Sequence, residues 1–401
     1  AAAYELDPIE LRRRNLIAAS EMPYVIPIEA LGEEVSYANG DYAALLDQAL
    51  DKIGWPGLQE TLARRRAAGE AVGAAVAIFV EKTGLGPRDG AHIIVDPAGG
   101  IELITGGASV GQGFEITMAQ ICADTLGVDY RRVRVIHGQT DRIEFGLGAH
   151  ASRATVMSGG ATHAAALAVR EKAIAMAAEL MQAPAETLDI VDGRVIRKDR
   201  PAGPSMSLGE IAASLAPTSK VLGDRTPGLS ADGWFHTAQM TYPYGIHLAV
   251  VRVDRETGAT VVERFLIAYD IGRAVNPMLV EGQLVGGFAQ GMGGALFEEF
   301  LYDSQGEPLS VTFADYLLPT IHEMPPVDIL LTEDAPSPRN PLGIKGAGEG
   351  GITAVAAAIA QAIDDAIGIK GAITTLPVTP QRLKAILDRA ARQSVPGSPA
   401  G

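Results

Sequence analysis

Glycine clusters that separate strand-like from helix-like segments are the feature that most limits how this chain can fold. The 401 residues include 46 glycines. Many of them gather in four clusters, at 106–113, 146–148, 286–294 and 346–351. In the clearest case, a strand-like run at 101–105 follows an expected hairpin turn and leads through the first cluster into an amphipathic helix. Strand, glycine turn and helix alternate in both halves without a fixed-period repeat, which predicts a mixed α/β (α+β) architecture.

Local signals place the other elements. Asp7 followed by Pro8 and Glu10 is typical of a helix start, because an aspartate cap, a proline in the first turn and a following glutamate suit the free N–H groups. Asp41 and Asn276 mark two further starts. The other expected helices cover 56–69, 114–126 and 152–181, a segment that ends near 367, and one that begins at 380. The expected strands cover 74–80, 92–95, 101–105, 132–137, 246–253 and 261–268.

Composition excludes several classes of function. The chain has 33 basic and 48 acidic residues, a net charge of −15, so it lacks the basic stripe that a nucleic-acid backbone requires. The single cysteine, Cys122, excludes a disulfide framework, a thiolate-ligated iron–sulfur cluster and a four-cysteine zinc site. We expect it to be a small buried residue on a helix. The seven histidines show no ligand spacing, and no uncharged apolar run reaches the roughly 18 residues that span a bilayer.

One motif suggests a serine hydrolase. Ser109 occupies the centre of a G-x-S-x-G pattern between an expected strand and an expected helix, which is the place of a nucleophile elbow. Asp270 and His322 follow in the order that such a triad takes. However, three fixed positions arise easily in a glycine-rich chain. A hydrolase with Ser109 as nucleophile therefore stands as an alternative hypothesis.

Two glycine-rich segments have the chemistry of anion sites. Gly111-Gln112-Gly113 precedes a helix N-terminus, where free N–H groups favour anions and glycine permits close approach. The alternative is close packing of the helix on a strand. Ser152 and Arg153 open another helix, and Arg153 is either a phosphate ligand or one partner of a surface ion pair.

A single carboxylate, Glu349, stands in a glycine-rich loop before an apolar helix. An acidic residue at this place either complements the helix dipole or serves as a general base where the backbone lets a substrate approach. The residues alone leave both interpretations open.

In this order and spacing, the segments resemble the molybdenum-containing hydroxylases, the xanthine oxidase and aldehyde oxidase family. The resemblance covers nearly the whole chain and rests on Asp7–Asn15, Gly111–Gly113, Ala151–Arg153, Asp270–Gly272 with Asn276-Pro277, Gly282-Gln283, Gln290-Gly291 and Gly348-Glu349. The stretch 137–148 is most similar to large subunits of the aerobic carbon monoxide dehydrogenase type. The resemblance to this family implies an elongated, two-lobed fold. Residues 1–38 would be the tail of a preceding molybdopterin-binding domain, 39–393 a second such domain, and 394–401 a frayed tail.

The resemblance also implies roles for individual residues. The family's centre is a molybdenum held by the dithiolene of a pterin cofactor, in bacteria usually a cytosine dinucleotide. Ala151 would approach the metal without coordinating it, and Glu349 matches the family's catalytic glutamate. The implied cofactor-binding residues are Gly111, Gln112, Gly113, Ala151, Ser152, Arg153, Asp270, Asn276, Gln283 and Gly348.

The implied reaction is the base-assisted hydroxylation of an electron-poor carbon, in an N-heteroaromatic, a purine, an aldehyde or carbon monoxide. Glu349 would take a proton, water would supply the oxygen, and two electrons would remain on the metal. Because this chain has no means of carrying those electrons away, [2Fe-2S] and FAD subunits are implied as partners.

The same resemblance implies a preceding molybdopterin-binding half and a dimer of heteromers. The chain begins without Met, so we expect a fragment or a naturally split subunit. We also expect a cytoplasmic location. A non-catalytic assembly subunit that keeps the fold and binds no metal is a further alternative.

Overall fold

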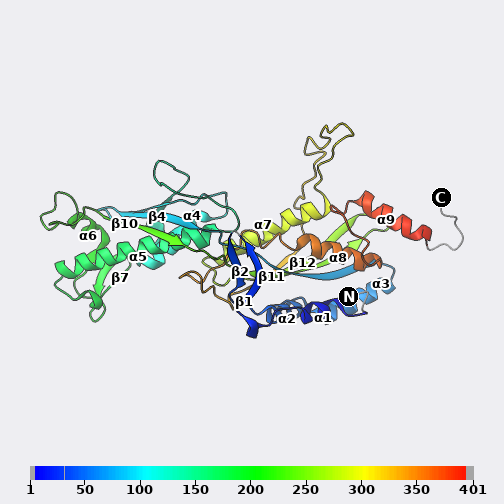
Figure 1. Cartoon of the computed structure of the whole chain (residues 1–401), viewed down its shortest axis with the longest axis horizontal. Helices are drawn as coiled ribbons and strands as arrows, with labels where there is room; N and C mark the ends of the chain where they lie inside the picture. The colour runs from blue at the N-terminus through cyan, green and yellow to red at the C-terminus, as the bar shows by residue number, and fades with distance from the viewer. Residues whose placement is uncertain (1–4, 31, 394–401) are drawn as a thin grey trace.

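The computed structural model describes residues 5–30 and 32–393. They form an elongated molecule with two lobes (Figure 1). The first lobe comprises residues 88–236, and the second is built from the segments on either side of it, 5–80 and 244–393. The predicted mixed architecture and elongated, two-lobed shape are confirmed.

A four-stranded sheet forms the centre of the first lobe, in the order β10-β4-β5-β6. β4 and β5 form the predicted hairpin, and α4 then returns the chain so that β6 pairs parallel to β5. β10 lies antiparallel to β4, and α5 packs on both of them. The elements are β4 (Arg88–Val95), β5 (Ile101–Thr105), α4 (Phe114–Leu126), β6 (Val133–Ile136), α5 (Ala154–Leu180) and β10 (Leu229–His236).

The second lobe has a sheet in the order β13-β12-β11-β3. β11 is antiparallel to both β3 and β12, whereas β13 is parallel to β12. α7 and α8 pack together, α8 covers β3 and β11, and α2 packs against β11 and β12. The elements are α2 (Tyr42–Ile53), α3 (Trp55–Ala67), β3 (Ala71–Val80), β11 (Tyr244–Val253), β12 (Thr260–Asp270), α7 (Pro277–Leu296), β13 (Val327–Thr332), α8 (Val355–Ile367) and α9 (Pro380–Gln393).

The two lobes share one topology. A hairpin leads through a helix to a parallel edge strand and then into a second helix, as β4-β5-α4-β6-α5 in one lobe and β11-β12-α7-β13-α8 in the other. The strand beside the hairpin comes after this unit in the first lobe (β10) and before it in the second (β3). The chain therefore forms the first part of the second lobe, then the whole of the first lobe, and then the rest of the second lobe. The junction between them brings together segments that are far apart in sequence.

Smaller elements complete the molecule, and all three predicted caps are present. Asp7 accepts hydrogen bonds from two backbone N–H groups, and Asp41 and Asn276 accept one each. Ile9 packs into the same core as α2. The boundary at residue 38 stays a prediction, and 394–401 lie outside the described residues. The smaller elements are α1 (Pro8–Arg14), the β1–β2 hairpin (Tyr24–Ala30, Glu33–Tyr37), the β7-β8-β9 sheet (Leu188–Val191, Arg194–Arg197, Met206–Ser207) and α6 (Leu208–Ser214).

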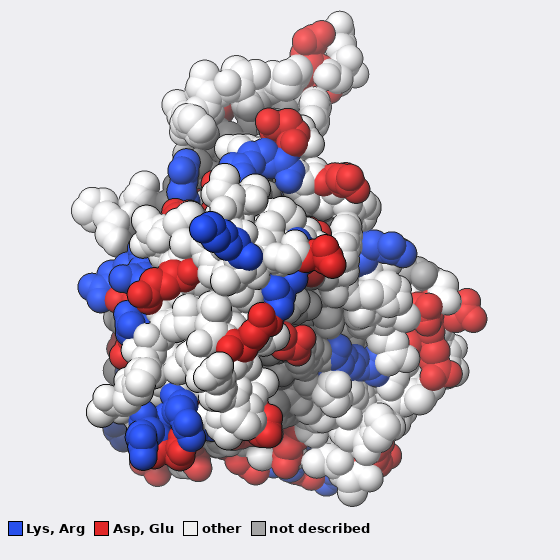
Figure 2. Space-filling model, turned by 90° about the vertical axis from the view of Figure 1, so that its left-hand side faces the viewer, with Lys and Arg blue, Asp and Glu red and all other residues white. Residues whose placement is uncertain are grey.

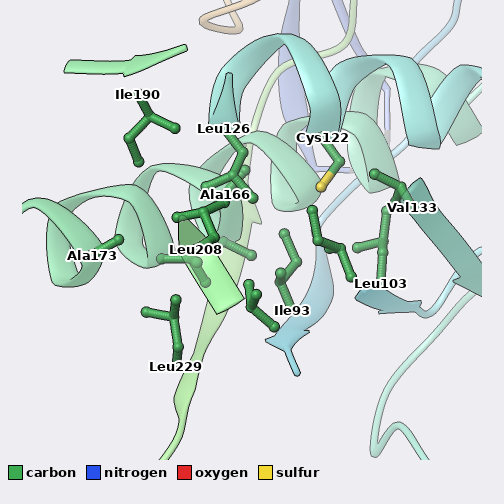
Figure 3. Close-up of a cluster of buried hydrophobic side chains, with 14 of the residues drawn as sticks. Ile93, Leu103, Cys122, Leu126, Val133, Ala166, Ala173, Ile190, Leu208 and Leu229 are labelled. Atoms are coloured by element: carbon green, nitrogen blue, oxygen red, sulfur yellow. The ribbon is translucent and has the colours of Figure 1, made fainter. Parts of the chain in front are cut away.

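Cys122 lies in the apolar core of the first lobe, as predicted. Figure 3 shows it on a helix, among Leu103, Val133 and other apolar side chains. It is fully buried, and burial raises the pKa of its thiol to about 12. The thiol is therefore protonated and takes part in packing rather than chemistry.

The surface mixes charges of both signs. Figure 2 shows acidic and basic side chains interspersed over the end of the first lobe, with no continuous basic area on that face. Within the described residues, no helix is long and apolar enough to cross a membrane.

Candidate active site

A cavity of about 300 Å³ lies at the junction of the lobes. Its walls come from four segments: the glycine loop before α4, the start of α5, the connection from β12 into α7, and the loop before α8. The structure thus brings together most of the predicted site. The predicted residues that line the cavity are Gln112, Ala151, Ser152, Arg153, Asn276, Gln283, Gly348 and Glu349.

The glycine loop before α4 places Gln112 in the wall. The Gln112 amide accepts a hydrogen bond from Val110 N–H (2.7 Å) and donates to the Ala108 carbonyl (3.2 Å), which stabilises the loop. Gly111 and Gly113 have left-handed φ values of 94° and 76° and are not among the lining residues. A Cβ on Gly113 would lie 2.7 Å from the side chain of Leu279 in the other lobe. Close packing between the two lobes is therefore the reason for a glycine at position 113. Gly113 is the N-cap of α4 and provides no side-chain cap, and Glu115 places its carboxylate in the first turn of the helix.

Two consecutive non-glycine residues in the wall are strained. Ala151 and Ser152 have φ values of 48° and 46°, in a region that non-glycine residues rarely adopt. Such strain persists only where surrounding contacts impose it, and it concentrates at functional sites. Here Ser152 Oγ accepts a hydrogen bond from Glu349 N–H (3.1 Å) and lies 3.0 Å from Glu349 Oε2. The loop at the start of α5 is thereby tied to the loop before α8.

Arg153 does not offer its guanidinium to the cavity. The side chain is completely buried and pairs with Asp89 at 3.1 Å, and it also donates to the carbonyls of Leu85, Arg88 and Gly148. The expectation of a surface ion pair is therefore wrong, whereas the role of Arg153 in binding the cofactor stays a prediction. The pair is internal, and it anchors the first residue before α5.

Asp270 is also an internal anchor. Its side chain is fully buried, it pairs with Lys345 Nζ at 3.2 Å, and it accepts hydrogen bonds from Thr332 Oγ1 and from three backbone N–H groups. No carboxylate oxygen of Asp270 is accessible in this structure, and the expected dinucleotide contact stays a prediction. Asp270 fixes Lys345, which lines the cavity. Burial lowers the pKa of Lys345, and Asp270 opposes that change.

The connection into α7 contributes polar groups to the opposite wall. Asn276 caps α7 through a hydrogen bond from Leu279 N–H (3.2 Å) and donates to Gln120 Oε1 (3.1 Å), while Gln283 lies two turns further along. Arg273 was not predicted. It is exposed, lines this cavity and a larger neighbouring depression of about 1110 Å³, and has no ion-pair partner among the described residues. Its position three residues after the end of β12 was the available signal.

Glu349 lies in the cavity wall with an exposed side chain. α8 begins at Val355 with Ala354 as its N-cap, so Glu349 stands outside the first turn of that helix. The interpretation of Glu349 as a complement to the helix dipole is therefore wrong, because that effect falls off within the first turn. The carboxylate is held instead by Ser152, across the cavity wall.

The serine hydrolase alternative is not supported. Ser109 Oγ donates to Glu115 (3.0 Å), and the other oxygen of Glu115 contacts His137 (2.9 Å). The expected partners are elsewhere, because Asp270 is paired with Lys345 and His322 is in an exposed loop of the second lobe. The hydroxyl of Ser109 is thus not aligned with a histidine base, as nucleophilic catalysis requires.

Within the described residues, no group of three or more His, Cys, Asp or Glu side chains could hold a metal ion. A family model described as a molybdopterin cofactor-binding domain matches residues 48–325, which include most of the lining segments. The chain belongs to the molybdopterin cofactor-binding domain family. The resemblance inferred from the sequence is therefore confirmed.

Relatives of known name cover almost all of this chain. It is 40% identical over 378 residues to the 6-hydroxypseudooxynicotine dehydrogenase complex subunit gamma of Paenarthrobacter nicotinovorans. The aligned residues make up 94% of this chain and 47% of the relative. Among solved structures, Cu,Mo-CO dehydrogenase matches with a TM-score of 0.88 and 30% identity, over 97% of this chain and 50% of that one. Quinoline 2-oxidoreductase from Pseudomonas putida 86 matches with a TM-score of 0.85 and 33% identity, again over 97% and 50%. The chain thus spans about half the length of these relatives.

Proposed function

We propose that this chain is the molybdopterin-binding part of a molybdenum hydroxylase large subunit, and that Glu349 is its catalytic base. The observation that carries the proposal is the convergence of Gln112, Ser152, Gln283 and Glu349 on one cavity from four separate segments. Membership of the family supports the cofactor, and the relation to Cu,Mo-CO dehydrogenase supports the metal.

The residues present fit a phosphate-bearing pterin cofactor. The helix N-terminus after Gly113 has no side-chain cap and suits an anion. The exposed guanidinium of Arg273 brings positive charge to the cavity of a chain whose net charge is −15. Gln112 and Gln283 add neutral amides that can bind ring or phosphate atoms. A metal that arrives with its own dithiolene sulfurs needs no cluster of protein ligands, and the cavity provides none in the described residues.

Each residue has a distinct part in this proposal. When bound, the cofactor would supply the metal-centred hydroxylation chemistry, with water as the source of oxygen. Gln112, Gln283 and Asn276 would bind and orient it, and Gly348 would leave room for it beside Ser152. Glu349 would accept a proton at its exposed carboxylate, while Ser152 keeps that carboxylate in place. Ala151 would contribute its backbone near the metal without coordinating it.

The cytosine dinucleotide form, the cytoplasmic location and the partner subunits also belong to this proposal. We infer [2Fe-2S] and FAD subunits in a dimer of heteromers, together with a polypeptide segment that supplies the other half of the relatives' length. The name of the 40% identical relative, a subunit of a complex, supports such an assembly. An arm of this chain, residues 298–323, stands out from the second lobe (Figure 1). It exposes Phe313 by 80% and Ile321 by 81%, as interaction surfaces do.

Among substrates, we favour N-heteroaromatic compounds over purines, aldehydes and carbon monoxide. The names quinoline and 6-hydroxypseudooxynicotine, carried by two relatives at 33% and 40% identity, both denote molecules with a nitrogen-containing aromatic ring. An electron-poor ring carbon next to nitrogen suits attack by an oxygen nucleophile.

Metal analysis of the purified assembly, combined with an assay of hydroxylation in ¹⁸O-labelled water, tests the proposed function. We expect one molybdenum per copy of this chain and incorporation of the label into an N-heteroaromatic product. An assembly that retains its partners without molybdenum would instead support a non-catalytic subunit.

A further inference from the structure

A buried glutamate that no sequence pattern singled out lies directly behind the cavity. Glu81 follows strand β3 and is only 8% exposed. Its Oε1 lies 2.9 Å from Ser152 Oγ, and its Oε2 lies 2.9 Å from the hydroxyl of Tyr269, which is completely buried. Ser152 Oγ lies 3.0 Å from Glu349 Oε2 at the same time. A continuous line of oxygen atoms therefore joins Glu81 to Glu349 through one hydroxyl.

The hydrogens available in this cluster do not suffice if both glutamates are ionised. Ser152 Oγ contacts two carboxylate oxygens, and the Tyr269 hydroxyl contacts Glu81 Oε2 and the Gly346 carbonyl (2.8 Å). Those are four oxygen–oxygen contacts, but the two hydroxyls carry only one hydrogen each. The N–H of Glu349 fills a separate contact with Ser152 Oγ. Two contacts would then join oxygen atoms with no hydrogen between them, which is repulsive beside a carboxylate.

One additional proton on the pair of glutamates reduces this shortage from two contacts to one. A proton on Glu81 Oε1 lets Glu81 donate to Ser152, and Ser152 can then donate to Glu349. The hydroxyl of Tyr269 remains free to donate to the Gly346 carbonyl or to Glu81. The contacts alone would also permit the proton on Glu349, so the environment must decide. Glu81 is buried whereas Glu349 is exposed, and burial penalises the charged form.

We propose that Glu81 is a positioning residue that holds a proton as a neutral carboxylic acid and, through Ser152, orients Glu349 as the ionised base. The assignment of Glu349 as the base rests on the proposed function, whereas the proton on Glu81 does not. A pair of carboxyl groups with different surroundings commonly divides acid and base roles in this way.

The neighbouring groups agree with a neutral Glu81. The pKa of Glu81 is raised to about 7, mainly by burial and also by the charge of Glu349, and the hydrogen bonds from Tyr269 and Ser152 oppose this increase. The cations nearby do not reverse this, because Lys345 is paired with Asp270 and the guanidinium of Arg153 with Asp89. His247 is fully buried, and burial lowers its pKa to about 3, so it is neutral.

The same contacts explain the strain in the cavity wall. Ser152 is held in its left-handed conformation by Glu81 on one side and by the loop of Glu349 on the other. Gly346 has room for no side chain, because a Cβ there would overlap the Ser152 carbonyl and lie 2.6 Å from Ser152 Cβ. Loss of the contact with Glu81 would let the Ser152 hydroxyl rotate and would release Glu349 from its orientation.

Infrared spectroscopy of the full chain tests the proton directly. We compare spectra between about pH 5.5 and 9 for the unaltered chain, Glu81→Gln, and the exposed control Glu60→Gln. We expect a protonated carboxyl C=O band that disappears with a midpoint near pH 7 in the unaltered chain and in Glu60→Gln. The band should be absent from Glu81→Gln at every pH. A band of equal intensity in Glu81→Gln, or no band in the unaltered chain, would overturn the proposal.

Activity of the assembled enzyme tests the positioning. Glutamine at position 81 can donate to Ser152 and accept from Tyr269 as a neutral acid does, whereas leucine fills the space without hydrogen bonds. We expect Glu81→Gln to keep kcat within a few-fold and to lose the pH dependence near 7. Glu81→Leu should lower kcat at least about tenfold with a smaller change in KM. Equal losses in the two variants would mean that position 81 requires a carboxylate, against the proposal.

The two hypotheses can fail separately. If Glu349→Gln is fully active or the assembly holds no molybdenum, the proposed function fails, but the infrared result for Glu81 still stands. If Glu349→Gln is inactive and Glu81→Gln retains the carboxyl band, the proposed function stands and the inference about Glu81 fails. Should Glu81→Leu not fold, Glu81→Gln and its spectrum still decide the question.

Discussion

Arg153 and Asp89 form an ion pair at 3.1 Å in which neither side chain is exposed to solvent. Asp89 lies in β4 and also accepts a hydrogen bond from Ser158 on α5 (2.8 Å), while Arg153 immediately precedes α5. The pair therefore ties the start of α5 to the sheet of the first lobe. The strained residues Ala151 and Ser152 stand directly before this anchor, so the position of the cavity wall depends on it.

We predict that Asp89→Asn destabilises the chain by about 3–5 kcal/mol, because it leaves the guanidinium of Arg153 buried without a counter-charge. The free energy of unfolding from urea titration measures this loss. Asp129→Asn, in the exposed pair with Arg131, is the matched control and should cost much less. Equal losses in the two variants would contradict the role of Arg153 as a buried anchor.

We predict that Glu349→Gln lowers kcat of the assembled enzyme at least about 100-fold, since an amide cannot accept the proton. The amide keeps the shape of the side chain and its contact with Ser152, so the molybdenum content should be unchanged. Glu60→Gln, at an exposed site on α3, controls for the loss of one negative charge. Steady-state kinetics and elemental analysis of the same samples give both quantities, and near-normal turnover would remove Glu349 from its role.

Much of the fold could be predicted from local signals. The caps at Asp7, Asp41 and Asn276 and the hairpin before β5 depend on contacts a few residues apart, and the structure has all of them. The weaker elements were missed for a physical reason. β10 contains Asp232 and Gly233 and is half exposed, so it lacks an apolar strand pattern and is stabilised by its pairing with β4.

The site was predictable only in part, because sequence indicates which groups are present and not which way they face. Arg153 and Asp270 looked like ligands, yet both side chains point into the protein and pair there. Glu81 gave no signal, since a single glutamate after an apolar strand is indistinguishable from a surface residue. Its importance follows from Ser152 and Tyr269, which are distant in sequence and close only in the folded chain.

We predict that the raised pKa of Glu81 makes stability depend on pH. The folded chain retains a proton up to about pH 7, whereas an unfolded glutamate releases it near pH 4.5. Between these values the folded state binds more protons, so the free energy of unfolding falls as pH rises, by up to about 1.4 kcal/mol per pH unit. This stabilisation is complete below about pH 4.5 and is lost above about pH 7.

Urea titrations of the unaltered chain and Glu81→Gln at about pH 5 and pH 8 isolate this effect from the other titrating groups. We compare the free energy of unfolding of the unaltered chain with that of Glu81→Gln at each pH. Relative to the variant, the unaltered chain should be more stable at about pH 5 than at about pH 8. The same difference at both values would show that Glu81 titrates like an ordinary glutamate.

We predict that Gly346→Ala disrupts the cavity, whereas Gly286→Ala does not. A Cβ at 346 would overlap the Ser152 carbonyl and lie 2.7 Å from Thr83 Cβ, and both neighbours are fixed by hydrogen bonds. We expect a loss of about 1–3 kcal/mol and reduced cofactor content. A Cβ at 286, within α7, would meet nothing within 4 Å, so this variant should be neutral or more stable by up to about 1 kcal/mol. Thermal unfolding and molybdenum content distinguish the two, and an unchanged Gly346→Ala would show that the loops before α5 and α8 can separate.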